Sequence, residues 1–190
     1  MTKRNIFFIT GVSTSGKTTL IPHIKNNLPE NFLVYDFDER GVPDNVTAEW
    51  RREETAHWIR IGIENAKQDK NTVICGISVP SEVARNTELL EKIDPHYLLL
   101  NVSPAEIKKR FVARLSTKEA QLDWARTTGL SVEESVARNV AFAANLREVC
   151  KEYACKVFDT SETTPERTAI NIAKWILKHA SSGYSKEALP

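Results

Sequence analysis

A short glycine-rich segment carries the clearest chemistry in this sequence. Residues 11–18 read Gly-Val-Ser-Thr-Ser-Gly-Lys-Thr and match the pattern G-x-x-x-x-G-K-[S/T] at every fixed position. In this pattern the first glycine permits a tight turn, the backbone N–H groups converge on a phosphate, and the lysine adds a point charge. The threonine hydroxyl is a ligand for Mg²⁺. The sequence therefore predicts a nucleotide phosphate site, formed by Gly11, Val12, Ser13, Thr14, Ser15, Gly16, Lys17, Thr18 and Thr19.

A pair of carboxylates follows further along the chain. Asp36 and Asp38 are two residues apart, so in an extended backbone both side chains point to the same face. An exposed acidic turn is the ordinary alternative for such a pair. Beside a phosphate loop, the pair indicates a place where a metal ion is held or a proton is accepted.

The composition excludes several classes of protein. The chain has 190 residues, 41% of them hydrophobic, and 26 basic against 25 acidic side chains leave a formal charge of +1. Such a chain is too apolar to be disordered, and it lacks the basic excess of a protein that binds double-stranded nucleic acid. Its apolar runs are too short for a signal peptide or a membrane span, and its three cysteines form no CxxC pair. We expect a cytoplasmic protein with reduced thiols.

Short apolar runs alternate with amphipathic stretches along the chain. Strands are expected at residues 5–10, 32–36, 72–75, 97–102 and 155–158. Helices are expected at 18–28, along the apolar face of Ala56, Ile59, Ile63 and Ala66, and after capping signals at Ser103–Glu106, Ser116–Glu119, Ser131–Glu134 and Thr164–Pro165. This alternation predicts a parallel sheet whose ligands bind at the carboxyl ends of the strands.

The phosphate loop in its strand–loop–helix setting resembles the P-loop kinases of small molecules, among them nucleoside monophosphate, shikimate and gluconate kinases. The resemblance implies the α/β, three-layer P-loop NTP hydrolase fold, with a five-stranded parallel sheet in the order 2-3-1-4-5 and helices on both faces. It also implies a small lid at about 115–131. The lack of an internal linker predicts a single domain over residues 1–180, and the Ser-Ser-Gly run after the last amphipathic stretch predicts a loose tail at 181–190.

The same resemblance implies ATP and Mg²⁺ as cofactors and assigns roles to particular residues. Thr18 and Asp36 would serve the metal, and Thr160 and Ser161 would lie at the adenine. Asp38 would hold the acceptor hydroxyl, and lid arginines would offset the charge of the transferred phosphoryl group. The expected catalytic residues are Lys17, Asp38, Arg110, Arg114 and Arg126, of which Arg114 is the favoured lid arginine.

Other P-loop classes fit less well. The N-K-x-D segment with which GTPases read guanine is absent, and no acidic pair ends the third expected strand, where Cys75-Gly76-Ile77 stands. We therefore expect an ATP-dependent kinase acting on a small molecule, as a monomer or homodimer, with no nucleic-acid or membrane partner. The alternatives are an ATPase switch that acts through a protein partner and a polynucleotide end kinase.

The sequence leaves the identity of the phosphoryl acceptor open. A sugar acid, a nucleoside and an antibiotic hydroxyl all fit the motifs. Arg40, Arg51 and Arg52 either contact a negatively charged acceptor or form ordinary surface pairs with neighbouring glutamates.

Overall fold

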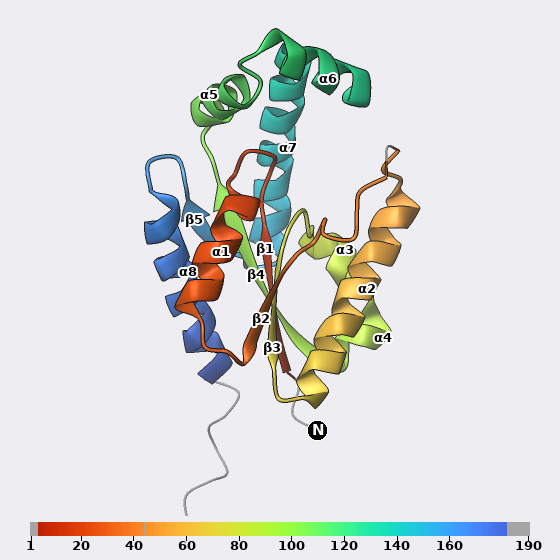
Figure 1. The fold of residues 1–190 in the computed structure, drawn as a ribbon. Helices are drawn as coiled ribbons and strands as arrows, with labels where there is room; N and C mark the ends of the chain where they lie inside the picture. Colours follow the sequence, from red (N-terminus) through yellow and green to blue (C-terminus); the bar gives the residue numbers. More distant parts are fainter. Residues whose placement is uncertain (1–3, 44, 182–190) are drawn as a thin grey trace, which may run out of the picture.

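A five-stranded parallel sheet forms the centre of the molecule. The computed structural model describes residues 4–43 and 45–181, and in it the strands lie in the order β2-β3-β1-β4-β5 (Figure 1). The strands are β1 (Arg4–Thr10), β2 (Phe32–Asp36), β3 (Asn71–Cys75), β4 (Ile93–Asn101) and β5 (Lys156–Asp159). The order and the parallel pairing confirm the fold expected from the sequence.

The central strand is buried on both faces. Ile6, Phe7, Phe8 and Ile9 of β1 have no exposed surface. Phe7 and Ile9 belong to one hydrophobic cluster, and Ile6 and Phe8 belong to another, because successive side chains of a strand point to opposite faces. This is why the sequence shows an unbroken apolar run here and not an alternating one.

Helices cover both faces of the sheet. The helices α1 (Lys17–Asn27) and α8 (Pro165–Ser181) pack on one face. The other face is covered by α2 (Ala48–Lys67), by the short helices α3 (Pro80–Ala84) and α4 (Thr87–Leu90), and by α7 (Val132–Glu152). The sequence did not indicate α3 and α4, which have one turn each and are too short for an amphipathic pattern. No helix in the described ranges is long and apolar enough to cross a membrane.

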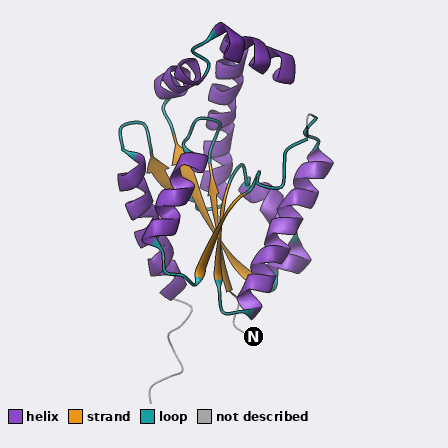
Figure 2. Cartoon of the chain, viewed as in Figure 1, coloured by secondary structure: helices purple, strands orange, loops and turns teal. Residues whose placement is uncertain are grey.

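Two helices and the first turns of a third stand beyond the carboxyl ends of the strands. The helix α5 (Pro104–Arg114) is anchored by its buried side chains Ile107 and Phe111, whereas α6 (Lys118–Thr128) buries none of its residues. Figure 2 shows these helices at the same end of the sheet as the loop between β1 and α1. The segment expected as a lid, residues 115–131, consists of α6 and the turns on either side of it.

Two expectations about element ends were wrong. Thr117, and not Ser116, caps α6, because the Thr117 hydroxyl accepts the N–H of Ala120 and α6 starts at the next residue. The strand β4 begins at Ile93, four residues before the expected start at Tyr97, since its backbone pairs with the full length of β1 despite the proline at position 95. The capping box at Ser131 and Glu134 is confirmed by both of its hydrogen bonds. The expected loose tail lies almost wholly outside the described residues.

Candidate active site

The loop between β1 and α1 has the backbone of an anion site. Thr14 and Gly16 both have positive φ angles, 68° and 96°. A Cβ on Gly11 would lie 2.6 Å from the Ser15 Oγ and 3.0 Å from the Leu100 carbonyl oxygen, so only glycine fits there. The helix α1 begins at Lys17 without a side-chain cap, which leaves its first N–H groups without an acceptor in the helix. Those donors and the helix dipole favour a bound phosphate.

Two hydroxyl groups in the loop also lack partners. Within the described residues, the buried Thr14 Oγ1 and Ser15 Oγ atoms make no hydrogen bond. The buried hydroxyl groups of Thr10, Thr55 and Ser78 also lack partners in the described part of the chain, but of the five only Thr14 and Ser15 line the cavity. The loop therefore offers donors that a nucleotide phosphate would satisfy, which fits the motif.

The Lys17 ammonium is held by the loop itself. Its Nζ atom donates to the carbonyl oxygens of Gly11 and Val12, at 2.7 and 2.8 Å. Burial lowers the pKa of Lys17 to about 8, although Asp38 and Asp36 act in the opposite direction. Because carbonyl groups and not a carboxylate hold the ammonium, its charge stays available for an anion.

The two aspartates meet through a turn and not through an extended strand. The strand β2 ends at Asp36, and residues 37–40 form a turn in which the Asp38 N–H donates to the Asp36 Oδ1 at 3.0 Å. The expectation of an extended backbone here was therefore wrong. The Thr18 hydroxyl donates to the Asp36 Oδ2 at 3.3 Å, which brings both residues expected to serve the metal together.

A Mg²⁺ ion beside bound phosphates needs few protein ligands. Within the described residues, no group of three or more His, Cys, Asp or Glu side chains could hold a metal ion by itself. Magnesium in phosphate sites usually keeps several waters and takes its other ligands from the phosphates. The Thr18 hydroxyl beside the Asp36 carboxylate fits that kind of site.

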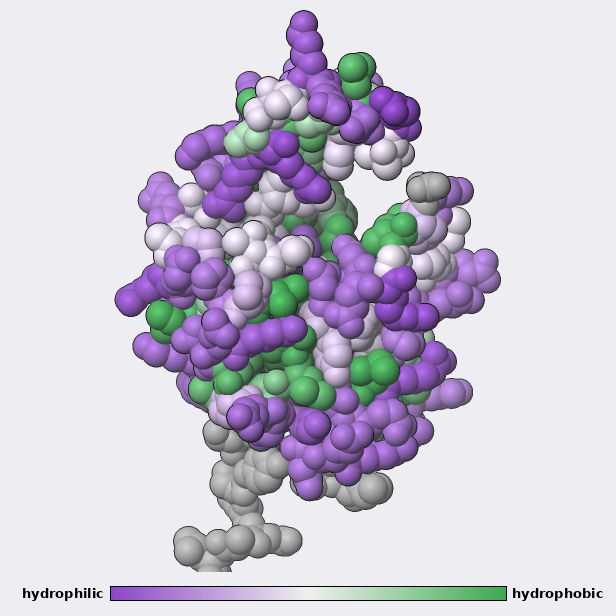
Figure 3. Space-filling view, viewed as in Figure 1, coloured by the Kyte–Doolittle hydropathy of each residue, from purple (hydrophilic) through white to green (hydrophobic). Residues whose placement is uncertain are grey.

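A cavity of about 1020 Å³ opens above the loop. Figure 3 shows the surface hollowed between the part formed by α5 and α6 and the end of α2. Asp38 lies on its wall, and burial together with the Asp36 charge raises the pKa of the Asp38 carboxyl. The wall includes Ser13 to Leu20, Asp38, Val42, Ile77, Arg110, Arg114, Trp124, Thr160, Thr163, Pro165 and Thr168.

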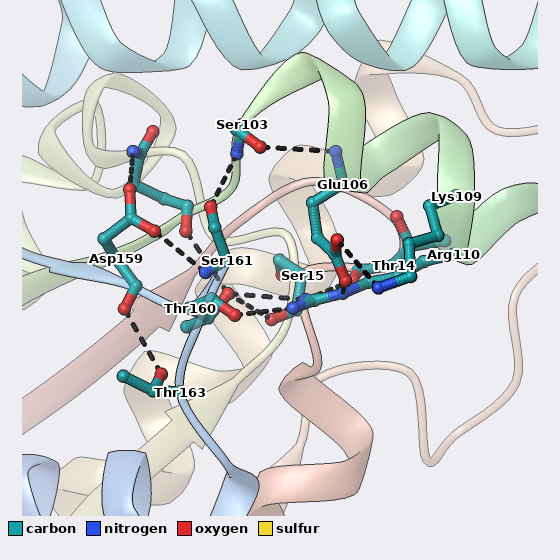
Figure 4. Close-up of polar contacts among 11 residues, drawn as sticks. Thr14, Ser15, Ser103, Glu106, Lys109, Arg110, Asp159, Thr160, Ser161 and Thr163 are labelled. Carbon is teal, nitrogen blue, oxygen red and sulfur yellow. Dashed lines mark hydrogen bonds and ion pairs between the residues drawn. The ribbon is translucent and has the colours of Figure 1, made fainter.

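Arg110 connects three parts of the chain (Figure 4). Its Nε donates to Glu106 in the same helix at 3.0 Å, and its Nη1 donates to the Thr14 carbonyl oxygen at 3.1 Å. Its Nη2 donates to the Thr160 carbonyl oxygen at 2.5 Å. This guanidinium is thus fixed between α5, the phosphate loop and the loop after β5.

Of the two residues expected near the adenine, Thr160 and Ser161, only Thr160 lines the cavity. Thr160 lines the cavity, and its hydroxyl donates to the carbonyl oxygen of Ser15 at 3.2 Å. The Ser161 hydroxyl accepts the N–H of Ser103 at 2.9 Å, which joins the loop after β5 to the start of α5, and Ser161 is not part of the wall (Figure 4).

The three candidate lid arginines differ in their partners and in whether they line the cavity. Arg114 lines the cavity, and its guanidinium carbon lies 5.7 Å from the centre of the Trp124 ring. It forms no ion pair with any described residue, so its charge is available. Arg126 is exposed, pairs with Asp123 at 3.1 Å, and lies outside the cavity wall. Of the three, only Arg114 combines an available charge with a place on the wall.

Comparison with known proteins gives relatives by structure alone. No family model matches the sequence, and no curated protein matches it. Among solved structures, a sugar kinase from Janibacter sp. matches 97% of this chain and 99% of its own, at 19% identity and a TM-score of 0.59. A gluconokinase from Sinorhizobium meliloti matches at 17% identity over 96% and 98% of the chains (TM-score 0.56), and a shikimate kinase from Acinetobacter baumannii at 17% over 94% and 95% (0.53).

The chain has the fold of the P-loop small-molecule kinases. A tRNA isopentenylpyrophosphate transferase from Staphylococcus epidermidis matches as well, at 12% identity over 93% and 100% of the chains, with a TM-score of 0.58. The P-loop kinase fold therefore carries more than one kind of transfer, and at these identities the likeness establishes the fold and not the substrate.

The cavity wall includes three apolar residues that sequence reasoning missed. Val42, Ile77 and Trp124 line the same cavity as Asp38. Val42 and Ile77 follow the ends of β2 and β3, so the rule that ligands bind at the carboxyl ends of parallel strands could have found them. Trp124 has a weaker signal, since it is the one aromatic residue in the segment at 116–129.

Proposed function

We propose that this protein transfers the γ-phosphoryl group of ATP to a hydroxyl group on a small molecule. The observation that carries the proposal is the continuity of one cavity. Its wall joins the phosphate loop to Asp38 on one side and to Arg114 on the other. A nucleotide held by the loop would thus have its terminal phosphate beside a carboxylate and an available guanidinium.

Each group has a role that its surroundings support. The loop N–H groups and Lys17 would bind the phosphates, with Thr18 and Asp36 beside the Mg²⁺ ion, which neutralises phosphate charge. Asp38 would accept the proton of the acceptor hydroxyl, and its raised pKa makes it a better base than an ordinary aspartate. Arg114 would stabilise the charge that develops on the transferred group. The adenine would lie against Thr160, Thr163, Pro165 and Thr168.

Movement of the lid would complete the site. Arg114 sits at the end of α5, and the segment 115–131 that follows includes a helix with no buried residue. A segment with so little burial opens and closes at low cost in free energy. Closure over bound ATP would exclude water and bring Arg114 toward the γ-phosphate.

The test is acceptor-dependent release of ADP from ATP·Mg²⁺. Lys17→Met should lower turnover by about 100-fold or more, since a charge at the transferred group is lost. Asp38→Asn should lower turnover to a similar extent yet keep the wild-type affinity for ATP, because Asp38 acts on the acceptor. Full activity in Lys17→Met would refute the site. ADP release that no acceptor stimulates would favour the ATPase switch, and strong competition by oligonucleotides at low salt would favour the polynucleotide end kinase.

A further inference from the structure

The cations on the cavity wall all lie toward the phosphates. Among the described residues of the wall, the basic side chains are Lys17, Arg110 and Arg114. Lys17 is held by the phosphate loop, and Arg110 is fixed to the carbonyl groups of Thr14 and Thr160. Arg114 is the arginine proposed for the transferred phosphoryl group. None of the three is left over for a negative charge on the acceptor.

The arginines nearest to the acceptor end are already neutralised. Arg51 of α2 forms a two-bond pair with Glu82 of α3, at 2.9 Å from Nε and 2.7 Å from Nη2, and also donates to the Ile77 carbonyl oxygen at 2.9 Å. The two side chains are only 20% and 24% exposed, so water screens this pair weakly. The sequence left open whether Arg51 contacts an acceptor, and its geometry is that of a structural ion pair between two helices.

Arg40 also has a carboxylate partner, although its own side chain is 49% exposed. Its Nη1 lies 3.0 Å from the Oε2 of Glu54, whose side chain is 7% exposed. The other carboxylate oxygen of Glu54, Oε1, is buried and has no hydrogen-bond partner among the described residues. Burial, Asp36 and Glu54 raise the pKa of the Asp38 carboxyl, whereas Lys17 and the paired Arg51 lower it. A negatively charged acceptor would therefore meet carboxylates without a free cation, which is unfavourable.

The cavity wall also carries apolar side chains. Val42, Ile77 and Trp124 line the same cavity as Asp38. Val42 is 48% exposed, so its side chain can contact a ligand in the cavity. Apolar and aromatic side chains bind the uncharged body of a ligand, and one carboxylate then selects its hydroxyl group.

We infer that the phosphoryl acceptor is an uncharged hydroxyl compound with an apolar or aromatic body, and not a carboxylate or a phosphate ester. Of the three classes that the sequence left open, the sugar acid is thereby disfavoured, and the nucleoside and the uncharged antibiotic remain. The inference rests on the proposed phosphotransfer. In that step the Asp38 carboxylate takes the hydroxyl proton, the acceptor oxygen forms a bond to the γ-phosphorus, and the bond from that phosphorus to the β-phosphate oxygen breaks to leave ADP.

The experiment separates acceptors by charge before they are identified. A protein-free extract of cells is divided by ion exchange into neutral, cationic and anionic fractions, and each is incubated with the protein, Mg²⁺ and ATP labelled at the γ-phosphate. Label should pass to a compound from the neutral fraction. Transfer only to a compound from the anionic or the cationic fraction would overturn the inference and keep the phosphotransferase. Transfer from no fraction, with ATP bound, would overturn the proposed function and the inference with it.

Removal of the negative charge of Glu82 from the helix pair tests the cause. Once an acceptor is found, Glu82→Gln should raise kcat/KM for its carboxylated analogue relative to the neutral compound by about tenfold, because Arg51 loses its counter-charge. The double variant Arg51→Gln/Glu82→Gln should return to the wild-type preference. Glu49→Gln is the matched control, since Glu49 lies 3.9 Å from Arg52 at an exposed position. An unchanged preference in Glu82→Gln would contradict the role of this pair. If that variant does not fold, the fractionation still decides the acceptor class.

Discussion

The phosphate loop holds the Lys17 ammonium by carbonyl oxygens. This ammonium is half-buried and has no carboxylate partner among the described residues, so it carries a cost of burial that a bound anion would relieve. The lowered pKa of Lys17, about 8, records that cost. A phosphate beside the ammonium would favour the charged form and raise the pKa again.

This shift makes nucleotide binding depend on pH in one direction. Below pH 8 the Lys17 ammonium keeps its proton with and without ATP, so its contribution to affinity is constant. Above pH 8 the free protein loses that proton, and binding must take it back, so affinity should fall as pH rises. Calorimetry at about pH 8.5 in buffers of different ionisation enthalpy should show uptake of a proton.

The matched variant for this prediction is Lys17→Arg. A guanidinium stays protonated across this range, so the variant should bind ATP without proton uptake even where its affinity is weaker. Absence of uptake in the wild-type protein would show that Lys17 is not the group that meets the phosphates.

At the scale of elements, the end of β3 positions the aspartate turn. The backbone N–H of Phe37 donates to the Cys75 carbonyl oxygen at 2.9 Å, and the Phe37 ring is 1% exposed. A Cβ on Gly76 would lie 2.0 Å from the Phe37 Cβ and 3.2 Å from its Cα. Phe37 lies between Asp36 and Asp38 in the chain. Because Gly76 has no side chain, Phe37 can pack against it, and the turn that carries both aspartates can approach the cavity.

Gly76→Ala should therefore impair the acceptor step more than nucleotide binding. The added methyl group must push Phe37 and move Asp38, and we expect kcat to fall by about tenfold or more, since small misplacements of reacting groups are costly. The affinity for ATP, measured by calorimetry, should stay near the wild-type value because the phosphate loop is not touched.

The control for this substitution is Gly62→Ala in α2. A Cβ there would lie 2.0 Å from the Cδ1 of the fully buried Ile6, at the sheet and away from the cavity wall. This variant should lose stability through overpacking, typically by about 1–3 kcal/mol, but should keep the kcat of the wild-type protein while folded. Equal kcat in both glycine variants would remove the proposed role of Gly76.

At the scale of the whole molecule, the cavity is assembled from distant segments. Its wall takes residues from the loop before α1, the turn after β2, the helices α5 and α6, and the loop between β5 and α8. Arg110 already connects two of these segments to α5. A nucleotide that contacts them all would bind only the folded chain and so stabilise it as a unit.

Thermal unfolding should show this stabilisation. At about 100 times its dissociation constant a ligand adds about 2.7 kcal/mol, which for a domain of this size raises Tm by about 5–10 °C. We expect such a shift with ATP·Mg²⁺ and a smaller one for Lys17→Met at the same nucleotide concentration. No shift in the wild-type protein at millimolar ATP would mean that the loop does not bind the nucleotide.

Local patterns in the sequence were enough for the fold and for part of the site. The glycine spacing at 11–18, the buried apolar runs and the helix caps depend on residues close together in the chain, and the parallel sheet, the loop conformation and the Ser131 cap agree with them. The strand order was expected only from the resemblance to the P-loop kinases, and the structure confirms it. Boundaries shifted where neighbouring residues offered the same chemistry, as at Ser116 and Thr117, because backbone geometry chooses between two adjacent hydroxyl groups.

Charge pairing and the wall of the cavity were decided by tertiary structure alone. Arg51 is 31 residues from Glu82, and Arg110 is 50 from Thr160. Nothing in the local sequence says which arginine is neutralised and which is free, because an ion pair depends on the distance between side chains and on their burial. The motif by itself therefore predicted a nucleotide phosphate site in the loop between β1 and α1. The packing of α2 on α3, and of α5 against the loops, determined which charges are left to meet an acceptor.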